Sequence, residues 1–431
     1  MPIEAHVSRD TRGGEVVREE ASLRVLKPRR AAPDHVVRPT RAEVDLTALR
    51  TNLRQVQRAA GTAKVWAVLK ADGYGHGAPA VARTLERAGV DGVAVALLEE
   101  AIELRDAGIR APILVMGGYY ADSYEELLAH DLVPVVYHVG HLQALARAAR
   151  TRGLGEVAER GLRVHLKIDT GMARLGVRPA ELPAMLEAFA AFPQIVIDGV
   201  MTHLACADAA DEQGDDSVRA QLTAFDRAVQ AVRAAGHTPR WQHAANSAAL
   251  LRSGVRSKTS SSLDARFSAV RPGIAIFGGV ASTRGDLELR QTLRLRSEIV
   301  DLRTIEVGEG VGYGHTFRAT RRTTVATVPM GYADGLPRSL SNQFSLLVRG
   351  HRAPIVGAVS MDLVTLDVTD VPNPRIRDEV VALGAATPER NAPIGARPAT
   401  IEVEELARAA GLIPWDIMTS ISRRVPRFYR T

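Results

Sequence analysis

Short runs of Val, Ile and Leu recur between residues 65 and 277, and longer amphipathic stretches separate them. The runs are apolar at consecutive positions, which is typical of strands buried on both faces of a parallel sheet. They lie at 65–69, 92–97, 112–116, 133–137, 163–168, 195–201, 240–245 and 273–277. Helical patterns fall between them, as at 78–88, 98–107, 139–150, 180–191 and 217–235. Eight such units predict an α/β fold, an eight-stranded βα-barrel of the TIM type.

After about residue 290 the pattern changes to alternating or short apolar blocks that turn residues punctuate. These blocks lie at 293–307, 323–331, 344–362 and 364–368, and helical patterns return only at 401–411 and 414–422. The change predicts a separate, mostly β C-terminal domain. We therefore divide the chain into a flexible basic extension (1–41), a barrel (42–285) and a mostly β domain (286–431).

Composition refines this division. The net charge is +6, but residues 1–41 hold nine Lys or Arg against six Asp or Glu, so half of the excess lies in the extension. A solvated tail explains that charge, and since no nucleic-acid-binding motif is present we expect no nucleic-acid partner. No apolar run is long enough to span a membrane. Cys206 is the only cysteine, which favours a reducing, cytoplasmic compartment.

Polar side chains gather where the predicted strands end, which is where barrels of this type carry out chemistry. Singly, these residues mean little, because a lysine after a strand usually extends its amine to water. Together they predict a site at one rim. They are Lys70 after the first strand, Lys167 and Arg174 at the fifth, His203 at the sixth, Ser247 at the seventh, and Arg271 and Gly273 at the eighth.

A lysine at such a rim, partly desolvated and near other cations, can form a Schiff base. Barrels also bind phosphate near their last two strands through hydroxyls and backbone N–H groups, and Ser247, Gly273 and the Ile274 amide are placed for this. A Schiff-base lysine beside a phosphate site predicts pyridoxal 5′-phosphate as the cofactor. Arg271 would face its pyridine nitrogen.

Seven segments then match one known family in order and spacing. They are AVLKADGYGHG (67–77), HLKIDTGMARLG (165–176), MTHLACAD (201–208), ANSAA (245–249), VRPGIAIFG (270–278), VGYGHTF (311–317) and GYADGLPR (331–338). From about Arg41 to its end, the chain resembles the alanine racemase family. The resemblance implies an amino-acid racemase, most simply of L-alanine to D-alanine for peptidoglycan precursors, that acts as a homodimer on a small amino acid and uses no metal.

The resemblance also implies roles for individual residues. Lys70 would carry the cofactor, Tyr313 would be the second base and come from the other subunit, and Arg271 would partner the pyridine nitrogen. Arg174 and the Met361 amide would hold the substrate carboxylate, and Lys167 matches a lysine that is often carbamylated. The phosphate contacts would be Tyr74, Ser247, Gly273 and Ile274, with Trp415 where the family has a tyrosine. Around the substrate entrance the family has residues that match Asp208, Tyr332 and Arg338.

Racemisation removes an α-proton on one face of a planar intermediate and returns one on the other, so two bases suit it. Lysine and tyrosine are poor bases at ordinary pKa values of about 10, so both must be tuned. We expect His203 to tune Tyr313 and to hydrogen-bond towards Arg271. An arginine does not readily give up its proton, so Arg271 would leave the pyridine nitrogen unprotonated and suppress side reactions.

Several positions depart from the family's common pattern. Trp415 replaces a tyrosine, Ala358 an arginine and Ser360 a cysteine, while Asp72-Gly73 stand where Asn-Ala is common. The changes at Trp415, Ala358 and Ser360 leave open a racemase of serine or of a broader range of amino acids. A barrel-type decarboxylase or aldolase, or a non-catalytic protein that binds pyridoxal phosphate, is a more distant alternative.

Overall fold

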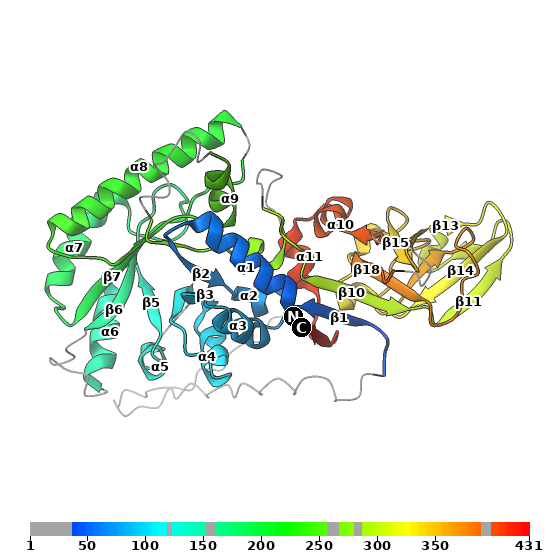
Figure 1. Cartoon of the computed structure of the whole chain (residues 1–431), viewed down its shortest axis with the longest axis horizontal. Coiled ribbons are helices and arrows are strands. Elements are labelled where there is room, and N and C mark those ends of the chain that lie inside the picture. Colours follow the sequence, from blue (N-terminus) through cyan, green and yellow to red (C-terminus); the bar gives the residue numbers. More distant parts are fainter. Residues whose placement is uncertain are drawn as a thin grey trace, which may run out of the picture.

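The computed structural model describes residues 37–118, 120, 123–151, 161–209, 211–256, 267–279, 287–388 and 398–431. These residues form a barrel ringed by helices and, beside it, an elongated domain made mostly of strands (Figure 1). Most of the basic extension expected at 1–41 lies outside the described residues. No helix within the described ranges is both long and apolar enough to cross a bilayer.

The barrel wall consists of eight parallel strands in the order β8-β7-β6-β5-β4-β3-β2-β9. Between β8 and β9, hydrogen bonds from Ser268 N to Gln242 O (3.1 Å) and from Arg271 N to Ala245 O (2.8 Å) bring the two ends together. The predicted eight-stranded βα-barrel is confirmed. Its strands are β2 (Lys64–Val68), β3 (Gly92–Leu97), β4 (Ile113–Gly118), β5 (Val133–Val136), β6 (Leu162–Lys167), β7 (Ile195–Met201), β8 (Trp241–His243) and β9 (Ala269–Val270).

Helices cover the outside of the barrel and bury one apolar face each against it. The first helix of the chain shows how the local sequence determines this packing. Asp45 is its N-cap and accepts a hydrogen bond from Ala48 N (2.8 Å), and Leu49, Leu53 and Val56 on its apolar face are fully buried. The helices are α1 (Leu46–Ala60), α3 (Ala78–Arg87), α4 (Leu98–Asp106), α5 (Tyr124–Ala129), α6 (Val139–Thr151), α7 (Leu182–Ala190), α8 (Glu212–Ala234) and α9 (Ser247–Arg256). A short 3₁₀ helix, η1 (Pro179–Glu181), precedes α7 and has no buried residue.

The last predicted strand, 273–277, is wrong: a 3₁₀ helix, η2 (Ile274–Phe277), occupies this segment, and β9 lies just before it. Pro272 has no N–H for a ladder, although its carbonyl accepts a hydrogen bond from Val68 N (2.9 Å). Gly278, with φ of 82°, ends the helix in the left-handed region. The chain therefore leaves the barrel wall after Pro272 and continues as η2.

The second domain is mostly β, as predicted. One sheet has the order β16-β15-β18-β10-β1-β20, with β19 paired to β18, and a smaller one has the order β11-β14-β17, while β12 pairs with β13. Strands and helices are β10 (Leu293–Glu298), β11 (Asp301–Ile305), β12 (Gly310–Val311), η3 (Tyr313–His315), β13 (Phe317–Arg318), β14 (Thr323–Val328), η4 (Tyr332–Asp334), η5 (Arg338–Leu340), β15 (Ser345–Val348), β16 (His351–Pro354), β17 (Val364–Asp367), β18 (Glu379–Ala385), β19 (Thr400–Ile401), α10 (Val403–Ala410), α11 (Pro414–Ser420) and β20 (Arg427–Arg430).

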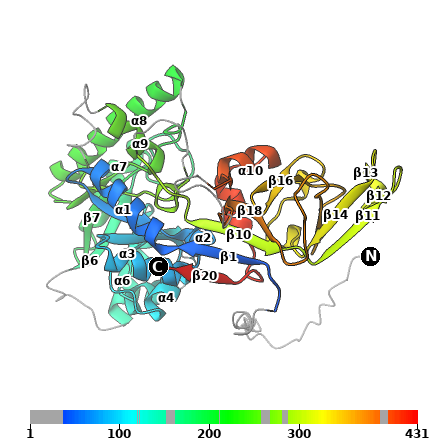
Figure 2. The same cartoon turned by 45° about the vertical axis from the view of Figure 1, so that its right-hand side comes forward.

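Both ends of the described chain join this larger sheet. β1 (Arg41–Asp45) pairs antiparallel with β10 and parallel with β20, and Figure 2 shows β1 and β20 together where the barrel and the β domain meet. A buried ionic cluster fixes this junction, since Arg294 contacts Glu43 at 3.0 Å and Glu379 at 2.6 Å. The strand that leads into the barrel is thus held by the domain that follows it.

The chain turns left-handed directly after β2. In α2 (Lys70–Tyr74), Ala71, Asp72, Gly73 and Tyr74 have φ angles of 53°, 54°, 61° and 53°. Such a conformation costs each non-glycine residue about 1–2 kcal/mol, so contacts from outside must hold it. The Asp72 carboxylate accepts from Ala78 N (2.8 Å), and Arg427 Nε in β20 donates to the Gly75 carbonyl (3.0 Å).

Gly75 is the point where this turn touches the second domain. A Cβ added there would lie 2.1 Å from the carbonyl oxygen of Met418 in α11. We expect Gly75→Ala to destabilise the protein by roughly 3 kcal/mol or more. Gly89→Ala is the matched control, because Gly89 has a similar φ (+83° against +78°) but open space around it. It should cost only about 1 kcal/mol. If thermal or urea unfolding showed that both variants lose the same stability, the close packing of α11 on the turn would be contradicted.

Candidate active site

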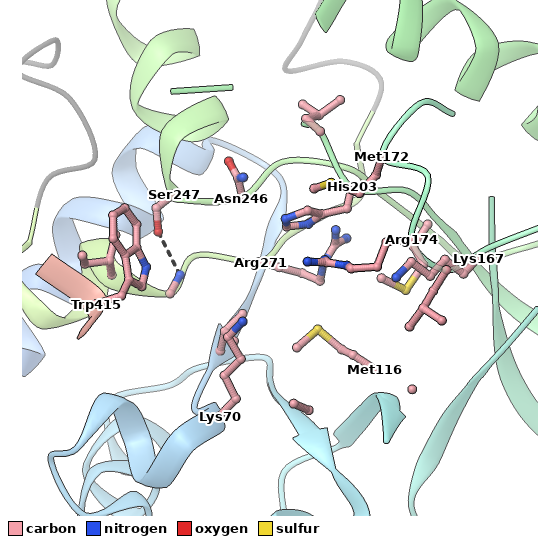
Figure 3. Close-up of a pocket in the computed structure, with 18 of the residues that line it drawn as sticks. Lys70, Met116, Lys167, Met172, Arg174, His203, Asn246, Ser247, Arg271 and Trp415 are labelled. Carbon is pink, nitrogen blue, oxygen red and sulfur yellow. Dashed lines mark hydrogen bonds between the residues drawn. The ribbon is translucent and has the colours of Figure 1, made fainter. Parts of the chain in front are cut away.

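A cavity of about 510 Å³ opens at the C-terminal ends of the barrel strands, and Figure 3 shows side chains from several strand ends and from α11 converging on it. It contains the predicted lysine and most of the other predicted site residues. The predicted residues that line it are Lys70, Tyr74, Lys167, Arg174, His203, Asp208, Ser247, Arg271, Gly273, Ile274 and Trp415.

One end of the cavity is rich in hydroxyls and backbone amides. Ser247 Oγ accepts hydrogen bonds from Gly273 N (2.9 Å) and Ala275 N (3.2 Å), which leaves its own O–H proton free to donate. A Cβ at Gly273 would lie 2.3 Å from the Tyr74 hydroxyl, so only glycine lets that hydroxyl approach the start of η2. Trp415 from α11 lines the same cavity (Figure 3). This end is suited to a phosphate group.

Arg271 is buried at the other side of the cavity, next to β8. Its guanidinium donates to the carbonyls of Thr202 (2.6 Å) and His243 (2.8 Å) and also contacts His243 Nδ1. The hydrogen bond expected between His203 and Arg271 is not among those of the described residues. The histidine in that role is His243, because it stands at the end of β8, the barrel strand next to β9 and Arg271.

His243 and His165 are the site-supporting residues that sequence patterns did not indicate. His165 Nδ1 lies 2.8 Å from His243 Nε2, and both rings are buried inside the barrel. Because Arg271 can only donate, His243 Nδ1 must accept its hydrogen bond. The orientation of both histidine rings beside the guanidinium is then fixed. The only available signal was that each of two predicted strands, 163–168 and 240–245, contains a histidine.

The loop after β6 is folded around one carboxylate. Asp169 Oδ1 accepts hydrogen bonds from the backbone N–H groups of Gly171 (3.1 Å), Met172 (2.9 Å) and Ala173 (3.1 Å). The three amides hold the pKa of Asp169 below its usual value despite some burial. Arg174 follows at once, so the same carboxylate sets where its guanidinium enters the cavity.

Cationic side chains outnumber anionic ones in the cavity, and this changes the pKa values of the residues that line it. Burial first, and Arg174 second, lower the pKa of Lys70. Burial, Arg174 and Arg271 lower the pKa of Lys167 to about 8, although Asp169 opposes them. Burial and the neighbouring cations lower the pKa of His203 to about 3, so its ring is neutral at physiological pH. The excess positive charge favours anionic ligands.

Four predicted residues lie outside this cavity, on the second domain. Tyr313, Tyr332 and Met361 are 76, 43 and 51% exposed, and Arg338 is exposed as well. Hydrogen bonds from Tyr332 N to Ser360 O (3.0 Å) and from Ala333 N to Met361 O (3.1 Å) join two of their segments. Tyr313 belongs to the segment between β12 and β13, two strands that lie at the end of the second domain away from the barrel (Figure 2).

The residues in the cavity fit pyridoxal 5′-phosphate. Lys70 offers an amine to the aldehyde, the hydroxyl-rich end offers donors to the phosphate, and Arg271 offers a donor to the ring nitrogen. The surplus of cations matches the charge of the phosphate. The donor set therefore agrees with the cofactor that the sequence predicted.

Comparison with known proteins gives a consistent result. Residues 44–281 match the family model of the alanine racemase N-terminal domain, and residues 292–429 match that of the C-terminal domain. The chain is 54% identical over 400 residues to the alanine racemase of Sorangium cellulosum, covering 91% of this chain and 100% of that protein.

Solved structures agree with the fold. The alanine racemase of D-cycloserine-producing Streptomyces lavendulae superposes with a TM-score of 0.80 at 33% identity, covering 92% of this chain and 98% of that one. The alanine racemase of Bartonella henselae, with covalently bound pyridoxal phosphate, gives a TM-score of 0.76 at 28% identity, covering 91% and 99%.

The lowered pKa of Lys167 predicts a pH dependence of stability. Its folded-state pKa of about 8 lies below the ordinary value of 10.5, so between these values the unfolded chain binds more protons. The loss of stability caused by burying the charged amine is therefore complete below pH 8, and it disappears as the pH rises to 10.5. In cofactor- and CO₂-free buffer, Lys167→Met should be more stable than the parent by ~2–3 kcal/mol at neutral pH.

Urea unfolding of parent and variant between neutral and strongly alkaline pH measures this difference. Groups common to both proteins cancel, so the gap should narrow as the pH rises through that window. A gap that stays constant with pH would show that Lys167 is not held in its neutral form by its surroundings.

Proposed function

Because the chain belongs to the alanine racemase family, we propose that it interconverts L-alanine and D-alanine with pyridoxal 5′-phosphate as its cofactor. One observation supports this most: a rim lysine, a hydroxyl-lined phosphate end and a buried arginine line a single cavity. Lys70 Nζ would hold the cofactor covalently, and Arg271 would face its ring nitrogen. The phosphate would be held by Tyr74, Ser247, Gly273, Ile274 and Trp415.

The bound cofactor withdraws electrons from the α-carbon and so acidifies the α-proton. Residues of the protein then move that proton. Lys70 Nζ would take or return it on one face, and burial together with Arg174 favours the neutral amine that this requires. Tyr313 Oη would serve the opposite face, and the neutral His203 ring offers a partner for its proton. Arg271 keeps its own proton and leaves the ring nitrogen without one.

The substrate carboxylate would lie between Arg174 and the Met361 amide. Lys167 is next to Arg174, and its pKa of about 8 leaves part of its amine neutral at physiological pH. A neutral amine can add CO₂ and release a proton, which would place an anion between Arg174 and Arg271 and offset the local positive charge. Asp208, Tyr332 and Arg338 would border the substrate entrance.

A homodimer belongs to the same proposal, because Tyr313 does not line the cavity of its own chain, and its segment between β12 and β13 lies in the part of the second domain away from the barrel (Figure 2). Its exposed face, which also carries Tyr332 and Met361, would close the cavity of the partner subunit. Ala358 adjoins Gly312, so this departure from the family pattern would affect the partner's site. A cytoplasmic location and the supply of D-alanine for peptidoglycan precursors rest on the family resemblance alone.

The reaction is tested with a panel of L-amino acids in deuterated water. We expect deuterium at the α-carbon and D-product from alanine above all others, scored by chiral chromatography. Lys70→Ala should abolish both the product and the visible absorbance of the bound cofactor. If no amino acid in the panel gave a D-product, the proposed function would be overturned. A preference for serine would change only the substrate.

Mixing two inactive variants tests whether Tyr313 acts in the partner's site. Lys70→Ala and Tyr313→Phe chains, co-refolded in equal amounts, should regain about a quarter of the native sites, because each mixed dimer contains one site with both bases. Lys70→Ala mixed with the double variant is the control and should regain nothing. If the first mixture stays as inactive as the control, Tyr313 does not act in trans.

A further inference from the structure

Glu100, in the first turn of α4, makes contacts that a helix cap does not require. Its Oε2 accepts hydrogen bonds from Ala96 N (2.9 Å) and Leu97 N (3.0 Å), which is ordinary capping of its own helix. Its Oε1 instead reaches the turn that follows the neighbouring strand, β2, and accepts a hydrogen bond from Ala71 N at 2.6 Å. One carboxylate thus joins the end of β3 to the residue that follows Lys70.

The backbone at Ala71 needs such a partner. Ala71 is the first of the consecutive left-handed residues, and a non-glycine residue adopts this conformation only when its surroundings hold it. The short distance and the ionised acceptor make this a strong hydrogen bond. It fixes the direction in which the chain leaves Lys70, and therefore the direction in which the Lys70 side chain enters the cavity.

Glu100 also carries the negative charge that opposes the cations around Lys70. Arg174 favours the neutral form of the Lys70 amine, and Glu100 favours the charged form. The same charge, after burial, raises the pKa of Tyr74 and so keeps its hydroxyl protonated as a donor. Other charged or titratable groups surround Lys70 and Glu100. They are Asp72 and Tyr74 on the turn, Tyr120, Lys167, His203, Asp208 and Arg271 across the cavity, and Glu99, Glu103, Arg423 and Arg427 around the hollow that Ala71 and Glu100 border.

We infer that Glu100 is a positioning residue for Lys70: its carboxylate holds the left-handed turn through Ala71 N and places a negative charge beside the residue that follows the lysine. The inference rests on the proposed function, in which Lys70 is the cofactor lysine and a base. It adds a residue of α4, outside the cavity, to the machinery of that site.

The chain supplies a matched control in Glu99. Glu99 precedes Glu100 and borders the same surface hollow, but it is exposed, and its side chain has no hydrogen-bond partner among the described residues. Glu99→Gln and Glu100→Gln remove the same charge one residue apart. Glu100→Asp keeps the charge but is too short to span from α4 to Ala71 N, so it separates the two effects.

The test uses the full chain freed of cofactor. Acetylation of Lys70 by acetic anhydride is followed against pH by peptide mass spectrometry, and amide hydrogen exchange is followed in the peptide that covers 70–76. In E100Q the labelling profile should move to lower pH, so that below its midpoint Lys70 reacts about three- to tenfold faster than in the parent or in E99Q. In E100D the profile should stay near that of the parent while exchange at 70–76 rises.

Exchange in distant barrel strands shows whether each variant is folded. A folded E100Q chain whose labelling profile coincides with that of E99Q would overturn the inference, and so would E100D and E100Q profiles that move together. Because neither cofactor nor substrate takes part, the result stands whether or not the chain racemises alanine. Failure here and failure of the proposed function are therefore separate outcomes.

Discussion

The left-handed turn after β2 is the constraint on which the site depends. A lysine that must reach a cofactor has to stand where the strand ends, yet the chain must then turn away to leave room for that cofactor. The turn after Lys70 does this with five consecutive residues at positive φ, from Ala71 to Gly75, only two of which are glycine. Such a turn does not hold by itself, so its stability comes from α4, from the start of α3 and from β20.

This constraint explains why the two domains are built as one unit. The Tyr429 hydroxyl donates a hydrogen bond to His76 O (3.2 Å), and α11 packs against Gly75. α11 also carries Trp415 to the phosphate end of the cavity. The mostly β domain therefore completes the site of its own barrel from behind, while Tyr313 of the same domain is exposed and does not line that barrel's cavity.

Electrostatics follow from the same arrangement. Parallel strands that end at one rim bring Lys70, Lys167 and Arg271 together, and the loop folded on Asp169 adds Arg174. Burial and the neighbouring cations make Lys70 and Lys167 less stable as charged groups, which lowers the pKa of both lysines. The site is thus prepared for anionic ligands, and it holds its amines closer to the neutral form that proton transfer needs.

The sequence by itself determined the barrel, the β domain and the rim residues, because apolar periodicity and strand-end chemistry are local properties of the chain. It failed at 273–277, where an apolar run follows Pro272 and a strand cannot be told from a short helix by composition. Only the tertiary structure decided that His243 rather than His203 contacts Arg271, and that Glu100 reaches Ala71 N. Those contacts join residues 28 or more positions apart, and they depend on which strands become neighbours when the barrel closes.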